Sequence, residues 1–181
     1  ATRVVEYEKK ERAPIFDRDT ETLMDLLNVN NYQKGSWVLH MLRLKLGDET
    51  FFRGIRNYYE AHKNSVATTE DLRMALEKAS GKNLRSFFAR WVYDSGHPQY
   101  ELSWQWLPRK NLKLILKQVQ PGNAFLDPVP LAITTAKGRR EIVLKPTGKD
   151  LVQTIPLGEK PIQIEVDPQN TLLREITVKS G

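Results

Sequence analysis

The sequence predicts an α+β protein of two domains. An all-helical domain is expected over residues 1–98, and an immunoglobulin-like β-sandwich of about seven strands over residues 99–181. Apolar residues recur every three or four positions before Pro98, whereas short alternating runs separated by turn-forming residues follow it. Eight of the ten prolines also lie after Pro98. The string Gly96-His97-Pro98 therefore marks the expected boundary.

The first domain is expected to start with a charged helical stretch to about Arg12 and a loop around Pro14, followed by four helices. The first is predicted from Tyr32 to Leu46 and the second over residues 51–59 after an N-cap at Asp48. The third is predicted over residues 72–79 after the string 68–71, and the fourth from near Asn83 through Val92. Apolar residues nearly encircle the first of the four, which predicts a helix buried on most sides. Gly47 stops this helix, and Asp48 is expected to cap the next one. The third follows Thr68-Thr69-Glu70-Asp71, a string typical of a capping box.

The second domain contains short runs of alternating or apolar residues. Seven strands are predicted, at 100–106, 112–119, 129–134, 141–144, 151–155, 162–166 and 176–178. Turns are indicated between them by Pro121-Gly122-Asn123, Lys137-Gly138, Thr147-Gly148 and Leu157-Gly158. Trp104 and Trp106 alternate on one face of the first strand, where we expect core packing rather than a platform for bases or sugars.

Composition narrows the classes of function. The net charge is +6, but the basic residues are scattered among acidic ones, which predicts a solvated surface and no nucleic-acid partner. The absence of cysteine excludes disulfides, thiolate catalysis and cysteine-bound zinc, and it leaves a cytoplasmic and a periplasmic or secreted location equally open. No stretch approaches the roughly 18 consecutive apolar residues of a membrane span, so no membrane segment is expected.

The sequence predicts neither a complete metal site nor a catalytic nucleophile within this chain. The three histidines, His40, His62 and His97, include no pair four residues apart, the spacing that lets two imidazoles on one helix face share a zinc ion. We expect His40 to be a partly buried helix residue rather than a ligand. Gly-x-Ser-x-Gly, Ser-x-x-Lys and glycine-rich phosphate loops are absent from the sequence. We therefore assign no metal ligand and no cofactor-binding residue to this chain.

A series of short motifs in a fixed order gives the strongest indication of function. The string Asn31-Tyr32-Gln33-Lys34-Gly35-Ser36-Trp37 closely resembles the segment of aminopeptidase-N-like zinc metallopeptidases in which Tyr-x-Lys-Gly opens a buried helix. The resemblance continues with its spacing preserved over about 70 residues. The further matching pieces are 46–51, 67–72, 80–84, 87–91 and 96–98. In the second domain the resemblance is weaker and rests on strand order, strand count and the Asp167-Pro168 ending.

The resemblance implies a fold and an activity. Residues 1–98 would complete the helical lobe of a thermolysin-like catalytic domain, and residues 99–181 would form the small β-sandwich that these enzymes place after it. In this family a His-Glu-x-x-His helix and a later glutamate hold zinc, and the glutamate of that motif is the general base. Neither motif is present in the sequence. We expect both to lie N-terminal to Ala1, so that zinc would be bound by the parent protein and not by this chain.

Tyr32 is the catalytic residue that the resemblance carries over to this chain. In the family, the phenol of the matching tyrosine donates a hydrogen bond to the oxyanion that develops when water attacks the peptide carbonyl. A phenol keeps its proton at neutral pH and can aim one donor where charge appears only in the transition state. Packing or hydrogen bonding at the helix start is the alternative role. Lys34 and Gly35 are expected to serve the surface and close helix packing, respectively.

Two functions remain open from the sequence. In the first, the parent is a zinc-dependent aminopeptidase, a hydrolase that removes N-terminal residues from peptides. This chain is then an inactive fragment that packs against the missing N-terminal part of its own protein. In the second, the chain belongs to a relative that kept the fold and lost the chemistry, and it acts as a non-catalytic protein-interaction module. The sequence upstream of Ala1 distinguishes the two.

Overall fold

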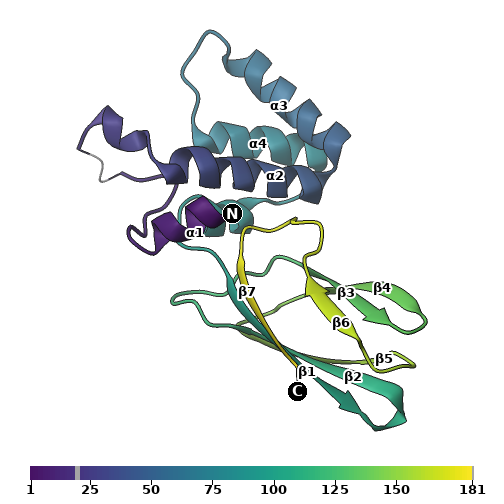
Figure 1. Ribbon diagram of the computed structural model, residues 1–181. Coiled ribbons are helices and arrows are strands. Elements are labelled where there is room, and N and C mark those ends of the chain that lie inside the picture. The colour runs from purple at the N-terminus through teal and green to yellow at the C-terminus, as the bar shows by residue number, and fades with distance from the viewer. Residues whose placement is uncertain (19–20, 181) are drawn as a thin grey trace. The chain divides into compact units, whose positions relative to one another are not determined.

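The computed structural model describes residues 1–18 and 21–180 and divides into two compact units. The first unit, Thr2–Gly96, is helical, and the second begins at His97 and contains two β-sheets (Figure 1). The predicted α+β class is confirmed. Among the described residues, no helix combines the length and the apolar character that crossing a bilayer would require.

The helical unit contains the four predicted helices, with altered starts. Its elements are α1 Thr2–Glu8, the 3₁₀ turn η1 Leu23–Leu26, the π-helix η2 Asn30–Lys34, α2 Gly35–Leu46, α3 Asp48–His62, α4 Thr69–Ser80 and α5 Arg85–Trp91. The helix predicted over residues 32–46 therefore corresponds to two elements, the π-helix η2 and α2, which follows it directly. The charged N-terminal helix ends at Glu8, before the expected Arg12.

A local capping signal accounts for the start of α4 but not for the start of α3. Thr68 and Asp71 form the predicted capping box: the Thr68 hydroxyl accepts a hydrogen bond from the Asp71 amide (3.2 Å), and the Asp71 carboxylate accepts one from the Thr68 amide (2.9 Å). The expected cap of α3 was wrong, because Gly47 is the N-cap and Asp48 is the first helical residue. Asp48 instead forms an ion pair with Arg43 at the end of α2 (2.6 Å).

The predicted burial of α2 on most sides was wrong for this chain. Its buried residues are Val38, Met41, Leu42 and Leu46. Leu39 and Leu44 are 41% and 50% exposed, and His40, expected to be partly buried, is exposed as well. Within the helical unit, α2 contacts η2 and α3. Leu39 and Leu44 therefore remain exposed in the part of the chain that the structure describes.

Helices α3 and α4 pack closely through a glycine. A Cβ atom added to Gly54 of α3 would lie 2.8 Å from Leu76 Cδ2 and 3.3 Å from Leu76 Cα on α4. Leu76 is fully buried, so its side chain has little room to move away. Gly35, which we expected to provide such a close approach, does not: its added Cβ would meet only the Asn30 carbonyl oxygen, at 3.9 Å. Gly54 performs the packing role that the sequence assigned to Gly35.

Residues 97–180 form seven strands close to the predicted ranges. The strands are β1 Gln99–Leu107, β2 Asn111–Gln118, β3 Val129–Thr135, β4 Gly138–Leu144, β5 Asp150–Pro156, β6 Gln163–Val166 and β7 Glu175–Ser180. One sheet has the order β5-β2-β1-β7 and the other β4-β3-β6. All paired strands are antiparallel except β1 and β7, which run parallel from the pair Gln99 and Glu175. Trp104 is buried, in agreement with its predicted core role, whereas Trp106 is only half-buried.

The strand order follows the immunoglobulin pattern only in part. The neighbours β5-β2-β1 and β3-β6 match the order E-B-A and C-F of an immunoglobulin domain. In that pattern the last strand lies in the second sheet, beside strand F. Here β7 lies beside β1 in the first sheet. The immunoglobulin type therefore remains a prediction.

The close approach of α3 to α4 leads to a stability prediction. We expect Gly54→Ala to lower the free energy of unfolding by about 1 kcal/mol. Overpacking costs roughly 1–3 kcal/mol, whereas the better helix propensity of alanine stabilises the helix by only about 1 kcal/mol. Urea denaturation followed by circular dichroism at 222 nm measures the change. Gly148→Ala is the matched control, since a Cβ there would meet nothing within 4 Å. Unchanged or raised stability in Gly54→Ala would contradict this account of the packing.

Candidate functional site

Tyr32 lies in the π-helix η2, and 58% of its surface is exposed. The Gly35 amide, just after this turn, donates its hydrogen bond to the Asn30 carbonyl five residues earlier, the spacing that defines a π-turn. Such turns are rare and are frequently found at functional sites. The structure thus places the predicted catalytic residue on an unusual piece of backbone, with its side chain accessible.

Tyr32 borders a hollow of about 320 Å³ within the helical unit. The hollow is lined mainly by apolar side chains contributed by the segment before η1, by η2 and α2, and by the α4 and α5 regions. Its lining residues are Ile15, Asn31, Tyr32, Gly35, Ser36, Val38, Leu39, Leu42, Thr69, Leu72, Phe88 and Val92. The phenol of Tyr32 therefore adjoins a largely apolar concave surface, the usual setting of a binding site.

Lys34, which we expected at the surface, is fully buried. Its Nζ lies 2.6 Å from Glu8 Oε1, and the side chains of Lys34 and Glu8 are 0% and 2% exposed. Burial lowers the pKa of Lys34, and the Glu8 carboxylate opposes this shift. The expectation was wrong because the partner comes from α1, which precedes Lys34 by 26 residues and supplies the compensating charge.

The start of the π-helix is held as well. Asn30 is 1% exposed, and its side-chain amide donates a hydrogen bond to the Ala13 carbonyl (2.9 Å). A second ion pair joins Arg90 of α5 to Asp94 (2.7 Å). It lies close enough to act on the pKa of Lys34, which Arg90 lowers and Asp94 raises. Contacts from outside the turn thus fix both ends of the five residues that carry Tyr32.

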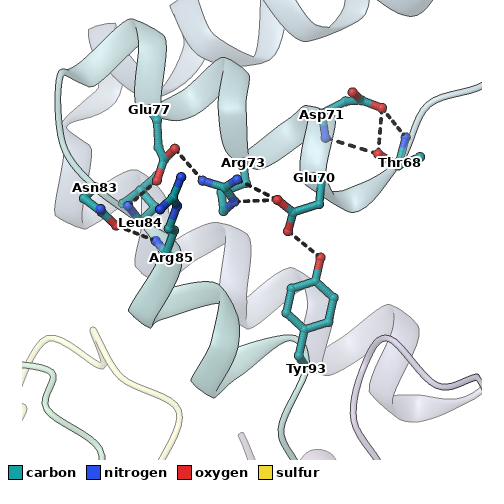
Figure 2. A network of polar contacts seen from close by, with 9 residues as sticks. All are labelled: Thr68, Glu70, Asp71, Arg73, Glu77, Asn83, Leu84, Arg85 and Tyr93. Atoms are coloured by element: carbon teal, nitrogen blue, oxygen red, sulfur yellow. Dashed lines mark hydrogen bonds and ion pairs between the residues drawn. The ribbon is translucent and has the colours of Figure 1, made fainter.

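A polar network joins α4 to the α5 region, and both regions contribute residues to the lining of the hollow. Figure 2 shows Arg73 between the carboxylates of Glu70 and Glu77, with ion pairs to both. Tyr93, after α5, donates a hydrogen bond to Glu70 (2.8 Å), and the Leu84 amide before α5 donates one to Glu77 (2.6 Å). The two glutamates therefore link the α4 helix to both ends of α5.

Hydrogen bonding sets the charge states in this network. Its bond to Arg73 lowers the pKa of Glu70, and the Leu84 amide lowers the pKa of Glu77. Burial raises the pKa of Tyr93, and its bond to Glu70 adds to that shift. At neutral pH the network consists of two carboxylates, one guanidinium and one neutral phenol, all paired. It is a structural connection and offers no free acid or base for chemistry.

The three histidines lie apart and share no site. His40 is exposed on α2 beside Trp37 (ring centroids 5.6 Å apart), and His62 ends α3 beside Tyr58. His97 is buried in the second unit, with its Nε2 2.9 Å from Glu175 Oε1. Within residues 1–18 and 21–180, no three side chains of His, Cys, Asp or Glu converge to hold a metal ion. The described residues do not fit a zinc centre.

The arrangement can supply one accessible phenol, held on a fixed turn beside an apolar surface. Reasoning from the sequence proposed a catalytic role for Tyr32, which stays a prediction, and missed the Glu8–Lys34 pair at the end of its turn. A signal was present, because Val4 and Glu8 are four residues apart on α1 and so share its buried face with Val5. Nothing in the sequence indicated that Lys34 would be the partner on that face.

Comparison with known proteins gives a consistent result. Residues 6–91 match the model of the Peptidase family M1 domain. Aminopeptidase N of Lactococcus lactis is 42% identical over 80 residues, which cover 44% of this chain and 9% of that protein. A probable aminopeptidase 2 of Sulfurisphaera tokodaii is 37% identical over 154 residues, covering 81% of this chain and 19% of that protein. The chain thus spans a small part of the length of these curated relatives.

A solved structure shares the fold. The crystal structure of Legionella pneumophila aminopeptidase A in complex with aspartic acid matches 93% of this chain with a TM-score of 0.76 and 16% sequence identity, and the match covers 20% of that protein. The family match includes the Tyr-x-Lys-Gly string at residues 32–35, and the S. tokodaii alignment is long enough to reach into the second unit. The chain is an aminopeptidase-N-like member of peptidase family M1.

Proposed function

We propose that the full-length protein is a zinc-dependent aminopeptidase that removes N-terminal residues from peptides, and that Tyr32 stabilises the transition state of this reaction. The observation that carries the proposal is the position of Tyr32, accessible on a π-turn and bordering an apolar hollow. The names of the relatives support the activity, since each of those described above is an aminopeptidase.

The proposed role of Tyr32 is that of a hydrogen-bond donor. When water attacks the scissile carbonyl of a peptide, its oxygen gains negative charge that is absent from the ground state. A phenol placed toward that oxygen stabilises the transition state more than the substrate and so raises turnover rather than affinity. The Tyr32 side chain is not tied to another side chain, since no such hydrogen bond is formed to its phenol in the described part of the chain.

Zinc and its ligands are proposed to belong to another part of the protein. The described residues contain no cluster of three or more His, Cys, Asp or Glu side chains that could hold the ion. When bound, zinc would polarise the carbonyl and activate the attacking water. This chain would contribute the phenol, the apolar surface next to it and the contacts that hold both.

The exposed side of α2 supports the proposal that another part of the protein packs on this unit. Leu39 and Leu44 are 41% and 50% exposed on a helix that is rich in apolar residues. A helix with apolar residues on nearly all sides is typical of a protein core. We infer that the N-terminal part of the same protein covers these residues and forms the opposite side of a peptide-binding cleft.

The first test uses the isolated chain. We expect residues 1–181 alone to bind no stoichiometric zinc, as measured by elemental analysis after dialysis against zinc, because the potential ligands among the described residues do not converge. We also expect no hydrolysis of aminoacyl p-nitroanilides. Zinc-dependent turnover by the isolated chain would contradict the proposal that the metal ligands lie elsewhere.

The second test replaces Tyr32 in the full-length protein. Tyr32→Phe removes only the phenol oxygen, and we expect kcat to fall by about 10²–10³, the usual cost of losing an oxyanion donor, with zinc content unchanged. Steady-state kinetics on an aminoacyl p-nitroanilide provide the measurement. Tyr59→Phe is a matched control, because Tyr59 is 62% exposed on α3 and does not line the hollow. Wild-type turnover in Tyr32→Phe would remove this residue from the mechanism.

A further inference from the structure

We propose that Lys34 is a positioning residue for Tyr32: its buried ion pair with Glu8 holds the π-turn in the conformation that presents the phenol. The inference rests on the proposed function of Tyr32. It assigns a role to two residues, Lys34 and Glu8, that do not border the hollow themselves. Their effect on the reaction would therefore be exerted through the backbone between Asn30 and Lys34.

The geometry of the turn supports this role. Tyr32 is the central residue of η2, and Lys34 is its last. Asn30, the first, is attached to the Ala13 carbonyl (2.9 Å), while Lys34 is attached to Glu8 (2.6 Å). A π-turn is uncommon because its hydrogen-bond pattern is less favourable than that of an α-helix, so contacts from the surrounding structure are needed to keep it. These two contacts hold the turn on both sides of Tyr32.

The character of the contact points to orientation rather than stability. The side chains of Lys34 and Glu8 are 0% and 2% exposed, so both charges have lost their hydration. Two apolar residues of similar size would often stabilise a buried site as well or better. What an ion pair adds is a directed contact between two specific atoms. Here that contact fixes the end of the turn that carries Tyr32.

A purely structural role, in which the pair only attaches α1 to the unit, makes a different prediction. Lys34→Met removes the ammonium that faces the buried Glu8 carboxylate at 2.6 Å, and stability should fall in either case. The double variant Glu8→Met/Lys34→Met removes both charges and should recover most of the lost stability. If the pair only stabilises, activity recovers with stability. If the pair positions Tyr32, activity stays low.

The kinetic experiment uses the full-length protein and both variants. We expect kcat of the double variant to remain about 10- to 100-fold below wild type with little change in KM, because a small displacement of a catalytic group has effects of this size. Thermal unfolding of the same samples gives the stability. Recovery of both stability and kcat in the double variant would overturn the inference.

A measurement on Tyr32 itself separates this inference from the proposed function. With 3-fluorotyrosine incorporated at position 32, the ¹⁹F resonance reports the surroundings of the ring whether or not the protein is active. We expect the resonance to shift or broaden in both Lys34 variants. Lys63→Met, which removes the ion pair of Lys63 with Glu60 at the end of α3, is the control and should leave it unchanged, because neither residue lines the hollow.

The two possible failures are then distinct. An unchanged ¹⁹F resonance in the Lys34 variants would show that the ion pair does not position Tyr32, whatever the kinetics. A shifted resonance combined with wild-type turnover in Tyr32→Phe would support the positioning role and overturn the proposed function of Tyr32.

Discussion

The ammonium group of Lys34 is enclosed by protein, and the carboxylate of Glu8 is its partner at 2.6 Å. Neither charge could be buried alone without a large loss of hydration free energy. The local structure of the helical unit therefore depends on α1 and η2 being in place together. The Ala13 carbonyl, a few residues after α1, makes the contact with Asn30, so the same stretch of chain supports both ends of the π-turn.

This dependence explains which parts of the structure could be predicted from the sequence. The capping box of Thr68 and Asp71 is local, because both partners lie within one helical turn, and it was predicted correctly. The strand ends were also predicted to within three residues, since alternation and turn residues are local signals. The burial of Lys34 was not, because its partner lies 26 residues earlier and nothing near Lys34 indicates it. For the same reason the close approach was expected at Gly35 and occurs at Gly54, where the contact comes from another helix.

In the candidate site, too, local sequence signals were predictive and contacts between distant segments were not. Tyr32 was identified through the Tyr-x-Lys-Gly string, and the structure adds that its ring is accessible beside a hollow whose walls come from distant segments. The apolar pattern of α2 indicated burial on most sides, whereas Leu39 and Leu44 are exposed in the described part of the chain. Periodicity predicts how much of a helix is apolar and leaves open what lies against it. Membership of peptidase family M1 supplies the context in which Leu39 and Leu44 can be understood.

The pairing of β7 with β1 has a consequence for biosynthesis. Gln99 at the start of β1 is paired with Glu175 at the start of β7, so a central contact of this sheet joins residues 76 positions apart. Contacts of such sequence separation slow folding, because a long loop must close before they form. While the chain is being synthesised, β1 and β2 can pair as a hairpin. The other edge of β1, which pairs with β7, stays open until β7 leaves the ribosome. An open strand edge is a site for incorrect pairing with other chains, and the second unit therefore has a period of vulnerability that ends only with its final strand.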